Sequence, residues 1–297
     1  MSTPSSAYRV MRKVWPHLSP DVRRRLGRRP PTQADDAGAG VLGAAPLDDV
    51  VAALRRDGVV TFDQRLDAAT VAALAEVATE HAAQPASGPP VRVLPPFDLP
   101  APRYDLDERD LLADRTVQSL VVDPSFRRIA EAYLGGEAVN DLAAMWWSIA
   151  RPGGPSSTAA QKFHTDRDRL AFLKFFVYLT DVGPDEGPHV YVEGSHRGLP
   201  RGLRGDRRFE DHEVAEAFGE GALRSLTGPA GTIFAADTAG LHKGLAPAVG
   251  HRLVFQLEFA TNLFGAPYVA VPDTVLAPDV RAAALARPRA YGRLLAA

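Results

Sequence analysis

Arg252-Leu253-Val254-Phe255-Gln256-Leu257-Glu258-Phe259 is the stretch of sequence that decides the fold. Its even-numbered residues, from Arg252 to Glu258, share one mainly polar face of a strand, and its odd-numbered residues form an apolar face. In a simple sandwich the polar face would lie in water. In a barrel that binds a charged ligand, the polar face lines the lumen and the apolar face packs against helices.

The pattern changes along the chain from helices to short strands. Apolar residues at helical spacing predict helices over about 47–54, 67–82 and 116–134, with a short strand at 59–62 after Asp57-Gly58. After Asn140, turn residues separate predicted strands at about 143–150, 162–166, 171–179, 188–192, 231–236 and 252–259. Helices followed by many short strands predict the α+β class. We expect a mainly β core, a jelly roll of the cupin-like, double-stranded β-helix type, with N-terminal and flanking helices.

Residues 46–297 are predicted to form a single domain. Its helical layer spans about 46–140, its jelly-roll core about 141–265, and a helical tail ends it. A proline-rich segment at 85–102 is irregular and 207–222 is a helical insertion.

Residues 1–45 are basic and allow two interpretations. They are either an N-terminal extension and linker, or they contain a short amphipathic helix. That helix would use Val10, Val14 and Trp15 to pack on the body or to meet an anionic partner.

Composition excludes several classes of protein. The chain of 297 residues has no cysteine, which excludes disulfides, iron–sulfur clusters and thiol nucleophiles. A net charge of -2 gives no reason to expect nucleic acid as a partner. No run of 18 apolar residues and no signal-peptide pattern is present, so we expect a cytoplasmic protein without a membrane partner. Only four of 34 basic residues are lysine, which is typical of a GC-rich bacterial coding bias.

Phe163-His164-Thr165-Asp166 is the candidate metal-binding segment. In an extended strand His164 and Asp166 point the same way and supply two of the three ligands of a facial metal site. Of the eight histidines, His242 is the best third ligand, because it follows a predicted strand and precedes a Lys-Gly turn. Arg252 lies ten residues later, where an antiparallel return would place it deeper in the same cavity. There it could hold the far carboxylate of a diacid that chelates the metal.

These residues occur in an order that resembles the phytanoyl-CoA dioxygenase family. The match comprises the His-x-Asp segment, the run Gly187-Pro188-His189-Val190-Tyr191-Val192-Glu193-Gly194-Ser195-His196-Arg197, and the spaced pair His242 and Arg252. The segment 55–60 also resembles that family's opening helix-to-strand turn, and the resemblance covers about 46–265. It implies a double-stranded β-helix that uses Fe(II), 2-oxoglutarate and O2.

The resemblance also implies individual roles. His164, Asp166 and His242 would hold iron, and Arg252 would pair with the C5 carboxylate of 2-oxoglutarate. The presence of Asp166 argues against a halogenase, in which a small residue replaces it. Further candidates for cosubstrate binding are Lys174, Thr238 and Gln161, and candidates for the substrate pocket are Trp147, Phe176, His189 and Lys243.

Each candidate has an alternative role. His164 and Asp166 could form a hydrogen-bonded pair in a turn, and Lys174 could meet a structural carboxylate or emerge to solvent. His189 could be an ordinary strand residue, and we expect His196 to be structural rather than a ligand.

The predicted function is oxidation, by default hydroxylation, of a polar or anionic small molecule in bacterial secondary-metabolite biosynthesis, with release of succinate and CO2. The loops 85–102, 150–160 and 198–226 are expected to wall the substrate pocket. Two other classes remain open at this point. A cupin-like protein could bind a metal or ligand without turnover, and a metal-dependent hydrolase could use the same ligands.

Overall fold

Two antiparallel sheets form the core of the protein. The structure, a computed structural model, describes residues 6–14, 18–27, 30, 40–43, 45–153 and 155–296. The large sheet has the order β1-β9-β6-β11-β5-β4-β2-β3 and the small sheet the order β10-β7-β8. The strands are β1 (Val59–Arg65), β2 (Ala82–Pro85), β3 (Val91–Arg92), β4 (Arg103–Leu106), β5 (Val139–Ile149), β6 (Phe172–Tyr178), β7 (His189–Val192), β8 (Leu223–Leu226), β9 (Thr232–Ala236), β10 (His242–Gly244) and β11 (His251–Ala260).

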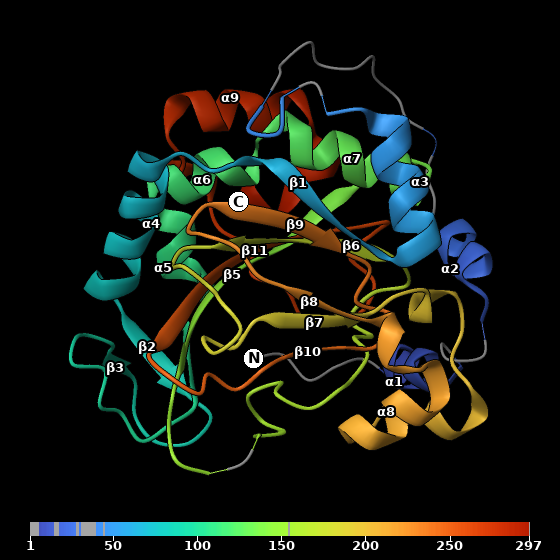
Figure 1. Cartoon of the computed structure of the whole chain (residues 1–297). Helices are drawn as coiled ribbons and strands as arrows, with labels where there is room; N and C mark the ends of the chain where they lie inside the picture. The colour runs from blue at the N-terminus through green and yellow to red at the C-terminus, as the bar shows by residue number, and fades with distance from the viewer. Residues whose placement is uncertain are drawn as a thin grey trace.

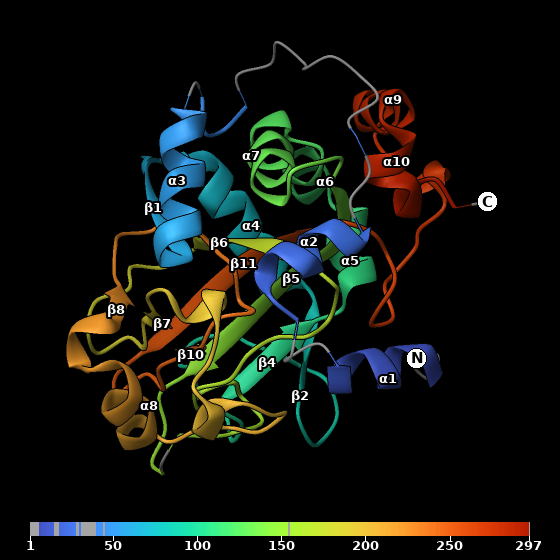
Figure 2. The ribbon, with the colours of Figure 1, turned by 90° about the vertical axis from the view of Figure 1, so that its right-hand side faces the viewer.

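Helices cover the face of the large sheet that points away from the small one (Figures 1 and 2). They are α3 (Leu47–Asp57), α4 (Ala68–Glu80), α5 (Glu108–Ala113), α6 (Arg115–Val121), α7 (Pro124–Leu134), α9 (Pro278–Ala286) and α10 (Pro288–Tyr291). The helix α8 (Asp211–Phe218) lies by the small sheet, at the far side of the molecule. A helical layer on a two-sheet β core confirms the predicted α+β jelly roll.

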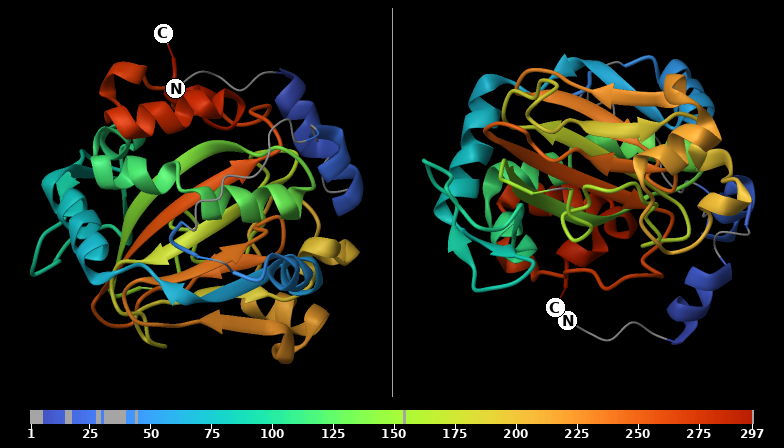
Figure 3. Two further views of the ribbon diagram at one scale, coloured as in Figure 1. Left: turned by 90° about the horizontal axis from the view of Figure 1, so that it is seen from above. Right: turned by 60° about the horizontal axis from the view of Figure 1, so that its bottom comes forward.

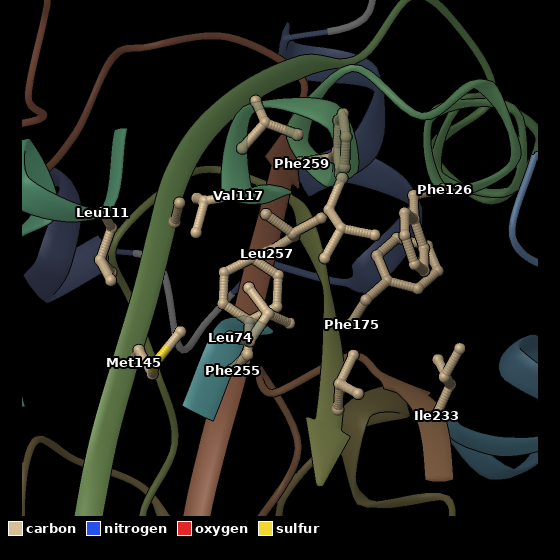
Figure 4. Packing of buried hydrophobic residues seen from close by; sticks show 14 of the residues in the cluster. Leu74, Leu111, Val117, Phe126, Met145, Phe175, Ile233, Phe255, Leu257 and Phe259 are labelled. Carbon is tan, nitrogen blue, oxygen red and sulfur yellow. The ribbon is translucent and has the colours of Figure 1, made fainter. Parts of the chain in front are cut away.

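Strand β11 has the two unlike faces that its sequence predicted. Phe255, Leu257 and Phe259 are buried in the core between the large sheet and the helices, where Phe175 and Leu74 also lie (Figure 4). Each such side chain contributes about 1.5–3 kcal/mol by leaving water. The opposite face of β11 therefore points into the space between the sheets.

Gly58 makes the tight connection between α3 and β1. Its φ of 83° lies in the left-handed region, where its N–H caps Leu54 O of α3. A Cβ at this position would collide with Tyr191 Oη and His196 Nδ1. Only glycine meets both requirements, which explains the Asp57-Gly58 signal at the end of the predicted helix.

Several predicted elements need correction. The segment 162–166 is not a regular strand, because only Phe163 and His164 form isolated bridges. The predicted helix 116–134 is two helices, since Asp123 caps a new helix at Pro124. Two groups of short elements were not predicted, because they lack a clear apolar period: the strands β2, β3, β4, β8 and β10, of which β3 lies within the segment 85–102 predicted to be irregular, and the helix α5.

In the described part of the N-terminal segment, the helices α1 (Ser6–Val14) and α2 (Pro20–Gly27) lie at one edge of the molecule (Figure 3). Tyr8 is buried, and its hydroxyl donates to Arg167 O at 3.2 Å. Val10 and Val14 are exposed, so the predicted packing face is wrong; the face carrying Tyr8 packs instead. Trp15 lies outside the described residues. Among the described residues, no helix has the length and apolar character needed to cross a bilayer.

Candidate metal centre

His164, Asp166 and His242 meet in the space between the two sheets. Their potential ligand atoms all lie within 4.8 Å of one another. Nε2 of His164 is 3.7 Å from Asp166 Oδ1, and Nε2 of His242 is 3.4 Å from Asp166 Oδ2. Two imidazoles and one carboxylate converging on one point fit a divalent iron with open positions on the opposite side.

Backbone pairing brings these distant segments together. His164 and His242 exchange both N–H···O bonds at 3.0 Å, and Asp166 N donates to Thr238 O at 2.8 Å. Ser195 of the Gly-Ser-His turn accepts from Leu241 N at 2.8 Å and donates to Val192 O at 2.6 Å. The predicted structural turn therefore fixes the residue that precedes the candidate ligand His242.

Both histidines present the same ring nitrogen to the metal position. His164 Nδ1 lies 2.9 Å from Lys162 O, and His242 Nδ1 lies 3.0 Å from Gly240 O. A carbonyl can only accept, so both Nδ1 atoms carry the proton. Each Nε2 is thus unprotonated and leaves its lone pair for a metal beside Asp166, in the tautomer that a metal ligand requires.

Burial keeps two imidazoles of this cavity neutral, those of His164 and His189. Burial, followed by the neighbouring His242, lowers the pKa of His164 to about 3. The same two causes lower the pKa of His189, which lies on β7 in the same cavity, well below its usual value. A neutral imidazole can bind a metal over the whole physiological pH range.

The metal-free protein should therefore lose stability as pH falls below about 6.5, the usual pKa of an unfolded histidine. Below that pH the unfolded chain binds protons that buried His164 and His189 exclude. Each histidine then removes about 1.4 kcal/mol of stability per pH unit. Urea unfolding at pH 7 and pH 5 measures this loss, which should be smaller in His189→Gln. An equal loss in both proteins would show that His189 is not held neutral.

Lys174 on β6 connects the metal centre to buried acids. Its Nζ lies 2.7 Å from Asp166 Oδ2, 3.2 Å from Glu258 and 3.7 Å from Asp168. Burial would raise the pKa of Asp166, but Lys174 and His242 lower it well below its usual value. Burial and the adjacent Asp141 raise the pKa of Glu258 well above its usual range. Lys174 thus meets carboxylates, which is one of the two alternatives that its sequence position allowed.

Replacing Lys174 with methionine should lower the free energy of unfolding of the metal-free protein by about 3 kcal/mol, because removing one partner leaves buried charge unpaired. Denaturant titration measures this change. A second substitution, Asp166→Asn, should recover part of the loss, because it removes the charged carboxylate that Lys174 contacts at 2.7 Å. Additive losses in the double variant would contradict this coupling.

Arg252 reaches the other end of the cavity. It is 4% exposed, and its Nη2 donates to Ser148 Oγ at 3.2 Å. Among the described residues, its Nε and Nη1 have no hydrogen-bond partner. Burial lowers the pKa of Arg252 to about 10, so the guanidinium stays charged at neutral pH. A buried cation with free donors fits the carboxylate of a bound diacid.

The cavity between His164 and Arg252 measures about 270 Å³. Lys174, Phe176 and His189, all predicted site residues, line it. Gln256, on the polar face expected to line the lumen, and Arg103 line it too. The sequence analysis missed other lining residues, among them Trp146, Tyr178 and Arg208. Of the loops expected to wall it, 150–160 contributes Ala159 and Ala160 and 198–226 contributes Arg208. The loop 85–102 contributes none of the lining residues, and Arg103 follows it directly.

Four predicted site residues do not line this cavity. Thr238 is buried, and its carbonyl accepts a hydrogen bond from the backbone N–H of Asp166. Gln161 lines a separate hollow of about 180 Å³ and accepts from Ser156 N. Trp147 lies in the core with the helices, and its indole donates to Ala78 O at 3.3 Å. Lys243 pairs with Asp211 of α8 at 2.6 Å.

Strand alternation explains two of these corrections. On β5, Trp146 pairs with Val254, which faces the cavity, so Trp147 faces the helices. Both residues are apolar, and the sequence offered no sign of which faces inward. On β10, His242 faces the cavity, and its neighbour Lys243 points away from the cavity toward Asp211 of α8 for the same reason.

Comparison with known families agrees with this site. The model of the family "Phytanoyl-CoA dioxygenase (PhyH)" matches residues 54–246, well over half of the chain. The chain belongs to the phytanoyl-CoA dioxygenase family. It is therefore an iron- and 2-oxoglutarate-dependent oxygenase, which confirms the resemblance seen in the sequence. No curated protein sequence matches it at a significant level.

Solved structures share the fold at low sequence identity. The 2-oxoglutarate-dependent carbocyclase SnoK from nogalamycin biosynthesis is 18% identical, with a TM-score of 0.52 over 71% of this chain and 83% of that chain. The epimerase SnoN, in complex with Fe3+, α-ketoglutarate and nogalamycin RO, is 22% identical, with a TM-score of 0.51 over 73% and 84%. These similarities confirm the jelly-roll fold of the PhyH-family chain.

Proposed function

We propose that this PhyH-family oxygenase hydroxylates a small molecule in bacterial secondary-metabolite biosynthesis, in the cytoplasm. We further propose that His164, Asp166 and His242 bind its iron and that Arg252 binds its 2-oxoglutarate. One observation carries the proposal. Three potential metal ligands converge at one end of a cavity, and the buried guanidinium of Arg252, which has no acidic partner among the described residues, lies at the other end. A cupin-like protein that binds only a metal would not need such a cation opposite the metal.

Iron with 2-oxoglutarate and O2 supplies oxidative decarboxylation, which yields succinate and CO2 and oxidises the substrate. The chain's own residues supply position and polarity. His164 and His242 offer fixed Nε2 donors, and Lys174 holds Asp166 in place through its Oδ2. Arg252 orients the far carboxylate through a planar fork of donors, and Phe176 and Phe234 keep the cavity wall apolar.

Two experiments test this proposal. Anaerobic addition of Fe(II) and 2-oxoglutarate should give a weak visible charge-transfer band, and admitting O2 should give succinate. Absence of both would contradict the iron and cosubstrate sites. SnoK and SnoN are described as a carbocyclase and an epimerase, so the reaction outcome needs its own test. With ¹⁸O2, a hydroxylated product carries one labelled oxygen, whereas ring closure or epimerisation leaves the product unlabelled.

A further inference from the structure

The segment 206–208 runs directly beside the proposed metal ligand His164. Phe209 and Phe163 form an antiparallel bridge, in which Phe209 N donates to Phe163 O at 2.8 Å. Continuing this register by one residue places Arg208 opposite His164. Opposed residues of an antiparallel pair point to the same face, so Arg208 shares the face on which His164 meets the metal. Both residues indeed line the cavity of about 270 Å³.

A second hollow of about 330 Å³ is also lined by these two residues. It shares His164, Asp166 and Arg208 with the first cavity, and its other lining residues are Thr165, Arg167, Asp168, Asp206 and Arg207. Arg208 therefore stands at the junction of the two hollows, next to the metal ligands. The first cavity continues to Arg252, whereas the second is lined by polar residues throughout.

Among the described residues, Arg208 forms no ion pair with an acid, whereas its neighbour Arg207 does. Arg207 pairs with Glu213 at 2.8 Å, and Arg167 donates to Gly205 O. Among the described residues, no carboxylate forms an ion pair with Arg208, which is exposed. The second hollow also contains two acids besides the proposed ligand Asp166. Asp168 lies 3.7 Å from Lys174, and Asp206 has an interaction partner of its own.

We propose that Arg208 binds an oxyanionic group of the substrate, a carboxylate or a phosphate, beside the iron. This inference rests on the proposed function, because it takes iron at the triad and 2-oxoglutarate at Arg252. The carboxylate of Asp166 and the two carboxylates of 2-oxoglutarate together balance the charges of Fe(II) and Arg252, so Arg208 keeps its uncompensated charge when both are bound. A guanidinium grips such an oxyanion through two parallel N–H donors. The substrate is then a small anion whose reacting carbon lies toward the metal.

Benzoate and benzamide are probes of the same shape that differ in charge. The full chain is loaded with Mn(II) and saturating 2-oxoglutarate, so that Arg252 is occupied, and the paramagnetic relaxation of the probe protons is measured. The protons of benzoate should relax faster than those of benzamide. The affinity of the protein for benzoate should be about tenfold lower in Arg208→Gln than in the wild type. Arg208→Lys should retain part of this affinity. Arg207→Gln, the matched control, should retain all of it, because Arg207 already has an acidic partner.

Equal relaxation of the two probes, or a benzoate effect that survives in Arg208→Gln, would overturn the assignment. Competition identifies the oxyanion: displacement by acetate indicates a carboxylate and displacement by inorganic phosphate a phosphate, whereas displacement by neither overturns the proposal. The charge-transfer band with Fe(II) separates the two levels of inference. A wild-type protein without the band contradicts the proposed function itself; a normal band without dependence on Arg208 contradicts only the substrate-binding role.

Discussion

His242→Ala should lower the affinity for Fe(II) by more than about 100-fold and abolish succinate formation. Losing a group that merely supports a ligand typically costs 10–100-fold in metal affinity, and losing a ligand costs more. His242 also holds its Nε2 3.4 Å from Asp166, so its removal takes away one of three donors directly. Anaerobic titration with Fe(II) in the presence of 2-oxoglutarate, followed by the visible band, measures the change.

The control must separate ligation from stability. His81→Ala removes a half-exposed histidine that lies 3.6 Å from Asp110 on the surface and should leave the band unchanged. His242 pairs through its backbone with His164 and Tyr191, and alanine retains those N–H and C=O groups. His242→Ala should therefore stay folded by circular dichroism. A folded variant that binds iron as tightly as the wild type would remove His242 from the metal site.

The sequence predicted the chemistry of this site better than its walls. His164, Asp166 and His242 have residue types and an order that few other functions require, and the structure brings all three together. Arg252 was predictable because polar residues alternate with apolar ones along β11. This alternation marks which face of β11 is polar, and the position of Arg252 on that face follows from it.

The cavity walls lacked such a pattern. Both Trp146 and Trp147 are apolar and β5 is buried on both sides, so no alternation marked the residue that faces the cavity. Arg208 was missed because its position depends on a single bridge between Phe163 and Phe209. A contact between segments more than 40 residues apart, made by two residues outside any regular strand, leaves no local signal in the sequence.

Arg252→Met should weaken 2-oxoglutarate binding by about 100-fold or more, while the affinity for Fe(II) stays close to that of the wild type. Losing a charge-assisted pair that is buried on binding costs about 2–5 kcal/mol, and 2.8 kcal/mol corresponds to about 100-fold. Titration of the Fe(II) protein with 2-oxoglutarate measures one constant, and titration with Fe(II) alone measures the other. Equal losses in both constants would contradict the proposed role.

The same substitution should stabilise the protein that lacks 2-oxoglutarate, by about 1 kcal/mol. Arg252 is buried without an acidic partner among the described residues, and its only hydrogen bond there goes to Ser148 Oγ at 3.2 Å. A buried cation in that state costs desolvation energy that an apolar side chain does not. Arg252→Lys keeps the charge but loses the planar fork, so it should bind 2-oxoglutarate with intermediate affinity and gain no stability. In Arg252→Met, denaturant unfolding should show higher stability and titration should show weaker binding of 2-oxoglutarate. An arginine that served the fold would instead lower the stability when it is replaced.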